Sequence, residues 1–326
     1  MPLAMGGAEL ARETRGVEYI LKAYASGVPL FPRSLLEDLD RQLALNGDCV
    51  YINNIDNIPQ EHYIKVPSVC GNSRPASDPH GSLTNLRPAS PGEELHFELN
   101  AITISYTKHI KPPKFALSEV TSAFGQARQA WQKSDACRSL KQHLATATFS
   151  VSINKIVCFG LGSLTGTDKP HPSRSNTQHA AVETMAEVLK ERSGRSIHCY
   201  AQEPEYNAVD KEFLETIKIT PVDDPKGFLE VDANTLVISV NPNVPVKQII
   251  ADIQWPAAML WNTVEPEEAE TREWEKMESG AWLSCIARSH HRYPVPKDEA
   301  RIIDQATNTL GDLHKPQVPP SIPVEL

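Results

Sequence analysis

The stretch that most constrains the fold is a short apolar run that ends in two closely spaced glycines. Residues 155–163 read KIVCFGLGS, and the four apolar residues after the lysine suit a strand that is buried on both faces. Gly160 and Gly162 follow, and an amphipathic helix is expected from about Asn176. A strand, a glycine turn and a helix form the first unit of a Rossmann-like sheet, in which the turn can approach a ligand closely. A plain strand-to-helix turn would use the same residues.

The chain continues with further strands that alternate with helices or turns. The predicted strands cover residues 197–201, 217–222, 236–240 and 257–261, and the predicted helices cover residues 178–192, 206–215 and 246–253, with a short turn at 228–232. This alternation is typical of a parallel sheet with covering helices. We therefore expect an α/β protein with a Rossmann-like, mostly parallel sheet over residues 150–262.

Two regions flank the predicted sheet. Residues 1–149 are expected to form a helical and β extension, and residues 263–326 an acidic helix and a tail. In the extension, Ser34 and Ser118 are expected to serve as helix N-caps. The expected elements are helices at 16–26, 34–46, 118–133 and 135–147, an exposed loop at 67–95 and a strand or hairpin at 96–107.

Composition narrows the class of protein. The chain has 326 residues, a formal net charge of -9 and six cysteines with no CxxC pair. These cysteines form neither a zinc framework nor a disulfide framework, and we expect no metal and no cofactor. No apolar run approaches the length of a membrane-spanning helix. We expect a cytoplasmic protein that has no membrane or DNA partner, since an acidic surface does not attract either.

One segment departs from this acidic balance. Residues 108–141 contain seven lysines and arginines and two acidic residues. Clustered cations in an acidic protein indicate a local anionic partner such as an RNA backbone. We therefore predict that Lys133, Arg138 and Lys141 bind tRNA. A solvated helical face beside an acidic neighbour is the alternative.

Acidic residues follow two of the predicted strands. Glu203 and Glu205 come after the second strand, and Asp223 and Asp224 after the third. Because the carboxyl ends of parallel strands meet at one edge, Glu203, Asp223 and Asp224 should converge in one crevice near residues 160–163. Carboxylates bind guanidinium groups bidentately, and one with a raised pKa can act as a general base. Ordinary helix capping would explain the same acids.

Several of these motifs together resemble a known family. They are IVCFGLGS, Gln178 in the following helix, the acidic-proline pair Glu203-Pro204, and TLVISVNPNVP from Thr235. This set resembles the SRR-like (sensitivity to red light reduced) domain. That family usually has Asp-Pro at the first pair and Pro-His where this chain has Asn241-Pro242. Most members are described as regulatory proteins, so a non-catalytic regulatory role is one implied function.

The whole chain is more similar to the fungal branch of that family, which includes arginine-containing cyclodipeptide synthases of secondary metabolism. This resemblance implies a transferase that joins arginine and a second amino acid, both delivered as aminoacyl-tRNAs, into a diketopiperazine. Its DDxxE motif implies catalytic roles for Asp223 and Asp224 and, as the next acid at a stretched spacing, for Glu230. Ser163 is expected to be exposed on the first turn, and the comparison also suggests that its hydroxyl carries a transient aminoacyl ester. The implied substrate-binding residues are Glu203, Glu205, Gly160 and Gly162.

A third function remains open from the sequence, a Rossmann enzyme that binds a nucleotide or a methyl donor. In that class an acid at the end of the second strand holds a ribose, which here would be Glu203. Glu203 lies about 40 residues past Gly162, against about 20 in the usual fingerprint. A co-purified nucleotide would favour this function, and co-purified tRNA would favour the synthase.

Overall fold

The fold is taken from a computed structural model, which describes residues 22, 26–53, 58–64, 81–84, 102–106, 114–165, 173–240 and 244–261. The helix expected at 16–26 and the acidic helix expected after residue 263 therefore fall largely or wholly outside the described residues. No helix in the described part of the chain is long and apolar enough to span a membrane.

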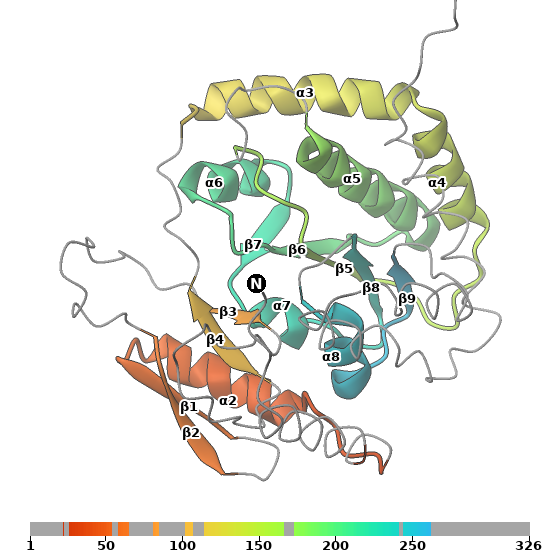
Figure 1. Cartoon of the computed structure of the whole chain (residues 1–326). Coiled ribbons are helices and arrows are strands. Elements are labelled where there is room, and N and C mark those ends of the chain that lie inside the picture. Colours follow the sequence, from red (N-terminus) through yellow and green to blue (C-terminus); the bar gives the residue numbers. More distant parts are fainter. Residues whose placement is uncertain are drawn as a thin grey trace, which may run out of the picture.

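The centre of the molecule is a five-stranded sheet in the order β7-β6-β5-β8-β9, and every neighbouring pair is parallel (Figure 1). The strands are β5 Lys155–Phe159, β6 His198–Gln202, β7 Ile219–Val222, β8 Thr235–Ser239 and β9 Ala258–Leu260. The Rossmann-like parallel sheet predicted from the sequence is thus confirmed, with the bounds of its first strand. From β5 the sheet grows on one side through β6 and β7, and then on the other side through β8 and β9. In sheets with such an order reversal, ligands usually bind at the carboxyl ends of the strands.

Helices cover both faces of the sheet (Figure 1). One face carries α3 Leu117–Lys133, α4 Asp135–Thr146, α5 Arg174–Ser193 and α6 Ala208–Thr216, and the other carries α2 Arg33–Ala44, α7 Lys226–Leu229 and α8 Val246–Ile253. Side chains of β5 alternate between the two cores. Ile156 and Cys158 pack into the first, and Val157 and Phe159 into the second. Burial on both faces explains the uninterrupted apolar run of this strand.

Local contacts define the ends of the helices that surround the glycine turn. The Ser173 hydroxyl accepts a hydrogen bond from the Asn176 amide at the start of α5, which ends at Gly194 with a φ of 67°. The Asn207 side chain accepts from the backbone of α6, and the Asp210 carboxylate accepts from the Asn207 amide. Such reciprocal capping satisfies amides that the helix itself leaves without a partner.

The N-terminal extension packs against the α7 and α8 side of the sheet. It contains α2, the antiparallel pair β1 Cys49–Asn53 and β2 Pro59–Tyr63, and the pair β3 Gly81–Thr84 and β4 Thr103–Tyr106. Leu36 and Leu39 of α2 are buried in the same core as Phe228 and Ile250. The Arg33 guanidinium donates to the carbonyls of α7 and its following turn, so α2 is joined to the sheet domain by polar and apolar contacts.

Several expected helix and loop boundaries were wrong. Ser34 lies inside α2, whose N-cap is Pro32, and Ser118 lies inside α3, whose N-cap is Ala116. The Glu119 carboxylate accepts from the Ala116 amide and replaces the expected serine cap. A strand at 81–84 interrupts the loop expected at 67–95, and the first two residues of the turn expected at 228–232 belong to α7. Capping depends on the backbone angles next to the helix, which a serine in the sequence does not determine.

Candidate functional site

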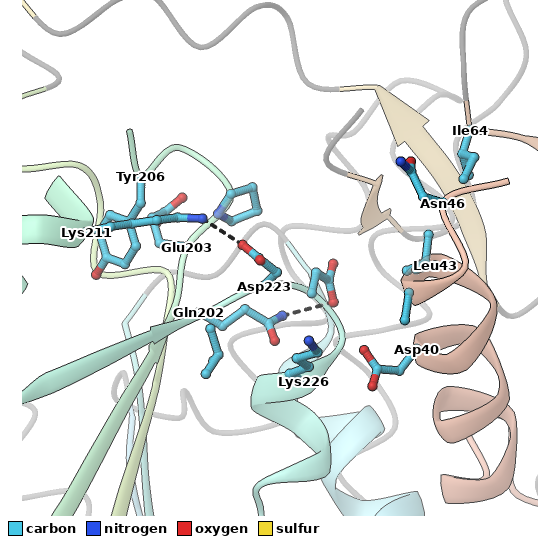
Figure 2. Close-up of a pocket in the computed structure, with 14 residues that line it drawn as sticks. Asp40, Leu43, Asn46, Ile64, Gln202, Glu203, Tyr206, Lys211, Asp223 and Lys226 are labelled. Carbon is cyan, nitrogen blue, oxygen red and sulfur yellow. Dashed lines mark hydrogen bonds and ion pairs between the residues drawn. The ribbon is translucent and has the colours of Figure 1, made fainter. Parts of the chain in front are cut away.

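A cavity of about 290 Å³ lies where β6 and β7 end (Figure 2). We call it the strand-end cavity. One wall comes from the sheet domain and the other from α2 and the residue after β2. The lining residues are Asp40, Leu43, Ala44, Asn46, Ile64, Gln202, Glu203, Pro204, Tyr206, Lys211, Val222, Asp223, Asp224 and Lys226. The structure therefore brings together Glu203, Asp223 and Asp224, which the sequence had placed in one crevice.

The two aspartates that follow β7 are held by different partners. Asp223 Oδ1 lies 2.9 Å from Lys211 Nζ of α6, in an ion pair that is partly open to solvent. Asp224 Oδ1 accepts a hydrogen bond of 3.0 Å from Gln202 Nε2. Both interactions are visible in Figure 2. They orient the two carboxylates from different sides.

Gln202, the last residue of β6, is a site residue that sequence reasoning missed. Its side chain is buried, and its Oε1 accepts from the Gly227 amide at 2.8 Å. A Cβ atom at Gly227 would lie 2.6 Å from that same oxygen, so only glycine lets α7 approach so closely. Gln202 thus connects α7 to Asp224. Its signal in the sequence was a polar residue at the end of an otherwise apolar strand.

Glu203 links the cavity to the glycine turn. Its Oε2 accepts from the Gly162 amide at 2.9 Å, and its Oε1 accepts from the Glu205 amide at 3.1 Å. Burial raises the pKa of Glu203 above its usual value, against the lowering effect of these two bonds. Gly160 and Gly162 both have positive φ angles, 72° and 79°, as the expected turn requires. Glu205 is exposed and does not line the cavity.

Ser163 is half-buried, and the expectation that it is exposed was wrong. Its hydroxyl donates to Asp210 Oδ2 at 2.7 Å and accepts from the Thr165 amide at 3.1 Å. Asp210 is fully buried and also accepts from the Leu164 amide at 3.0 Å. Burial raises the pKa of Asp210, because a charged carboxylate is disfavoured away from water. Ser163 is not among the residues that line the cavity.

Glu230 lies at the opposite edge of the sheet. Its carboxylate is 3.1 Å from Nζ of Lys155, the first residue of β5, and Lys155 also pairs with Asp232 at 3.1 Å. The cavity adjoins the carboxyl ends of the strands, whereas Lys155 marks the amino end. The structure therefore separates Glu230 from Asp223 and Asp224.

A buried aromatic pair lies behind the cavity wall. Tyr206 lines the cavity, and its hydroxyl lies 2.7 Å from His179 Nε2. The other ring nitrogen of His179 lies 2.7 Å from the Ser175 carbonyl, which can only accept. We therefore assign the proton to Nδ1 of a neutral His179, with Tyr206 donating to Nε2. Burial lowers the pKa of His179 to about 4.

The three predicted tRNA-binding residues are all exposed on α3 and α4. Arg138 pairs with Asp135 and donates to the Lys133 carbonyl at 3.1 Å. The end of α4 lies beside the end of α5, because Arg192 donates to the carbonyls of Leu144 and Ala147. No residue that lines the cavity comes from α3 or α4, and α4 lies across the molecule from α2 (Figure 1).

Metal coordination has no support in the described part of the chain, where no group of three or more His, Cys, Asp or Glu side chains could hold an ion. The side chains of the strand-end cavity instead offer carboxylates, lysines and a tyrosine. This arrangement can bind a small charged ligand and can exchange a proton with it.

The fold and the cavity define an α/β protein with a ligand site at the carboxyl edge of a parallel sheet. Comparison with protein families matches residues 136–312, more than half of the chain, to the SRR1 domain. The chain belongs to the SRR1 domain family. No curated protein and no solved structure gave a match. The match begins in α4, so α2 and its cavity-lining residues lie outside it.

Proposed function

We propose that this protein is a tRNA-dependent cyclodipeptide synthase that joins arginine and a second amino acid into a diketopiperazine. The observation that carries the proposal is the charge of the strand-end cavity. Four carboxylates line it, from Asp40, Glu203, Asp223 and Asp224, against the two lysines Lys211 and Lys226. An excess of carboxylates in a small cavity favours a cationic ligand, and guanidinium matches carboxylate geometry bidentately.

The chemistry needs a base near the bound amino group. In the first step the α-amine of one aminoacyl ester attacks the ester carbonyl of the other. An amide bond forms, the ester C–O bond breaks, and the hydroxyl that carried the ester, of the tRNA or of Ser163, leaves with a proton. The free α-amine of the joined dipeptide then closes the ring in the same way on the remaining ester. Glu203 suits the proton transfer, because a general base works best when its pKa lies near the operating pH, and burial raises the pKa of Glu203 in that direction.

Ser163 is the proposed hydroxyl for a transient aminoacyl ester. Asp210 Oδ2, 2.7 Å away, can accept the hydroxyl proton as the serine oxygen attacks. The neighbouring Gly162 amide is bonded to Glu203, which lines the cavity, so the serine lies one residue from a direct contact with the site. Ester transfer to Ser163 would release the first tRNA before the second aminoacyl ester enters.

The glycine turn gives less support to a nucleotide-binding enzyme. A phosphate bound there would need the backbone amides of the turn as donors. The Gly162 amide already donates to the carboxylate of Glu203 at 2.9 Å, and that negative charge opposes a phosphate at the same place. The proposal therefore favours a cationic ligand over a dinucleotide.

The exposed side chains of Lys133, Arg138 and Lys141 support a contact with the tRNA backbone. Because they lie away from the cavity, this contact would hold the body of the tRNA rather than its aminoacylated end. Charge reversal at these residues should therefore weaken tRNA binding without changing the ligand in the cavity.

Expression of the full chain in a bacterial host tests the function, because the host supplies charged tRNAs. We expect mass spectrometry of the medium to detect an arginine-containing cyclic dipeptide that an empty-vector culture lacks. Folded, soluble protein without such a product would contradict the synthase and favour a regulatory protein that only binds a ligand in the cavity.

A further inference from the structure

The α2 wall of the strand-end cavity contributes a carboxylate that lies outside the residues matched to the SRR1 domain. We infer that Asp40 is the specificity-determining residue that binds the guanidinium group of the substrate. This inference rests on the proposed function for the identity of the cationic ligand. It assigns the choice of that ligand to the N-terminal extension, which lies outside the matched SRR1 domain.

The other carboxylates of the cavity are already engaged by the protein. Asp223 pairs with Lys211, and Glu203 accepts from two backbone amides. Asp224 accepts from Gln202. Among the described residues, by contrast, Asp40 makes no hydrogen bond or ion pair, although it is half-buried. Figure 2 shows its side chain pointing from α2 toward the strand ends.

The backbone of α2 holds Asp40 in a fixed position. The preceding residue, Leu39, is 1% exposed and packs into the core beneath α7 and α8. Arg33 donates to the carbonyls of Leu229 and Val231 at 3.0 and 2.6 Å. Asp252 of α8 accepts from two amides just before α2, at 2.7 and 3.0 Å. A carboxylate on a helix anchored at this many points can select a ligand by position as well as by charge.

The size and the apolar part of the cavity fit an arginine side chain. A volume of about 290 Å³ is at the small end of the range for ligand sites, which suits an amino acid rather than a dinucleotide. Leu43 and Ile64 line the same wall as Asp40 and can pack against the methylene stem. Once the Lys211–Asp223 pair is set aside, three carboxylates face the single ammonium of Lys226 in this cavity.

The test is a calorimetric titration of the purified full chain with L-arginine methyl ester, which mimics the aminoacyl end of arginyl-tRNA. L-Citrulline methyl ester is the neutral comparison, because it has nearly the same shape without the charge. Asp40→Asn is the test variant. Asp38→Asn is the matched control on the same helix, since Asp38 pairs with Arg41 and does not line the cavity.

We expect the wild type and Asp38→Asn to bind the arginine ester and to discriminate against the citrulline ester. Asp40→Asn should weaken binding of the arginine ester at least tenfold and lose most of that discrimination, with an unchanged melting temperature. Failure of the wild type to bind the arginine ester, or equal binding by Asp40→Asn, would overturn the inference. Asp40-dependent binding by a protein that makes no cyclic dipeptide would refute the synthase and leave the Asp40 assignment standing.

Discussion

Replacing Gly227 with alanine should damage the cavity through Gln202. The new Cβ would lie 2.6 Å from Gln202 Oε1, 2.9 Å from Gln202 Cβ and 3.1 Å from a ring carbon of Phe159. The Gln202 Cβ cannot retreat, because β6 pairs with strands on both sides, and Phe159 is stacked on Phe228 with ring centroids 4.4 Å apart. Overpacking of this kind destabilises a protein by about 1–3 kcal/mol. A loss of about 2 kcal/mol should lower the melting temperature by about 4 to 8 °C.

Gly125→Ala is the matched control for this substitution. Gly125 lies inside α3, and no atom comes within 4 Å of an added Cβ. Alanine there should raise the melting temperature, since it stabilises a helix by about 0.5–1 kcal/mol relative to glycine. Differential scanning calorimetry of both variants should show shifts of opposite sign. An unchanged melting temperature for Gly227→Ala would refute the packing argument for Gln202.

Three further predictions concern pH, the anchoring of α2 and the basic segment. Because burial lowers the pKa of His179 from 6.5 to about 4, the folded state resists its protonation, so stability is lost as pH falls from about 6.5 toward 4, by at most about 3 kcal/mol. Urea unfolding across that range should show a shallower loss for His179→Gln, and equal pH profiles would exclude this role. Arg33→Ala removes two hydrogen bonds to the backbone near α7, so it should cost about 2 kcal/mol in urea unfolding and weaken binding of the arginine ester. Unchanged binding would show that Arg33 does not fix the cavity wall. Charge reversal of Lys133, Arg138 and Lys141 to Glu should reduce the slope of log Kd for tRNA against log salt by about one unit per lost phosphate contact. An unchanged slope would identify the segment as a solvated face.

The parallel sheet was predictable because its strands are buried on both faces. In a chain of alternating strands and helices, an apolar run such as β5 that is followed by glycines with positive φ angles is best explained as a central strand of a parallel sheet. The convergence of Glu203, Asp223 and Asp224 followed from topology alone, since the carboxyl ends of parallel strands share an edge.

The partners of the site residues were not predictable in the same way. Asp40 follows a buried leucine on an amphipathic helix, and only the packing of α2 against α7 and α8 places it beside the strand ends. The separation of Glu230 from the other acids arises because the short α7 returns the chain to the amino edge, where Lys155 binds it. Ser163 follows a glycine turn that usually exposes its residues, but the N-terminus of α6 brings the buried Asp210 within 2.7 Å of its hydroxyl. Each of these contacts is between elements far apart in the sequence.

The carboxylates that follow β6 and β7 are central to the proposed function. The most direct measurement follows formation of the arginine-containing cyclic dipeptide by purified protein supplied with arginyl-tRNA and a mixture of other aminoacyl-tRNAs. The variants are Asp223→Asn, Asp224→Asn and Glu203→Gln, each with a melting curve. Glu187→Gln, an exposed carboxylate on α5, is the matched control. We predict a loss of at least tenfold in product for Asp224→Asn and Glu203→Gln, with melting temperatures near that of the wild type and full activity in Glu187→Gln. Undiminished product in all three cavity variants would contradict the account, and loss accompanied by a collapsed melting temperature would show that these acids only cap the fold.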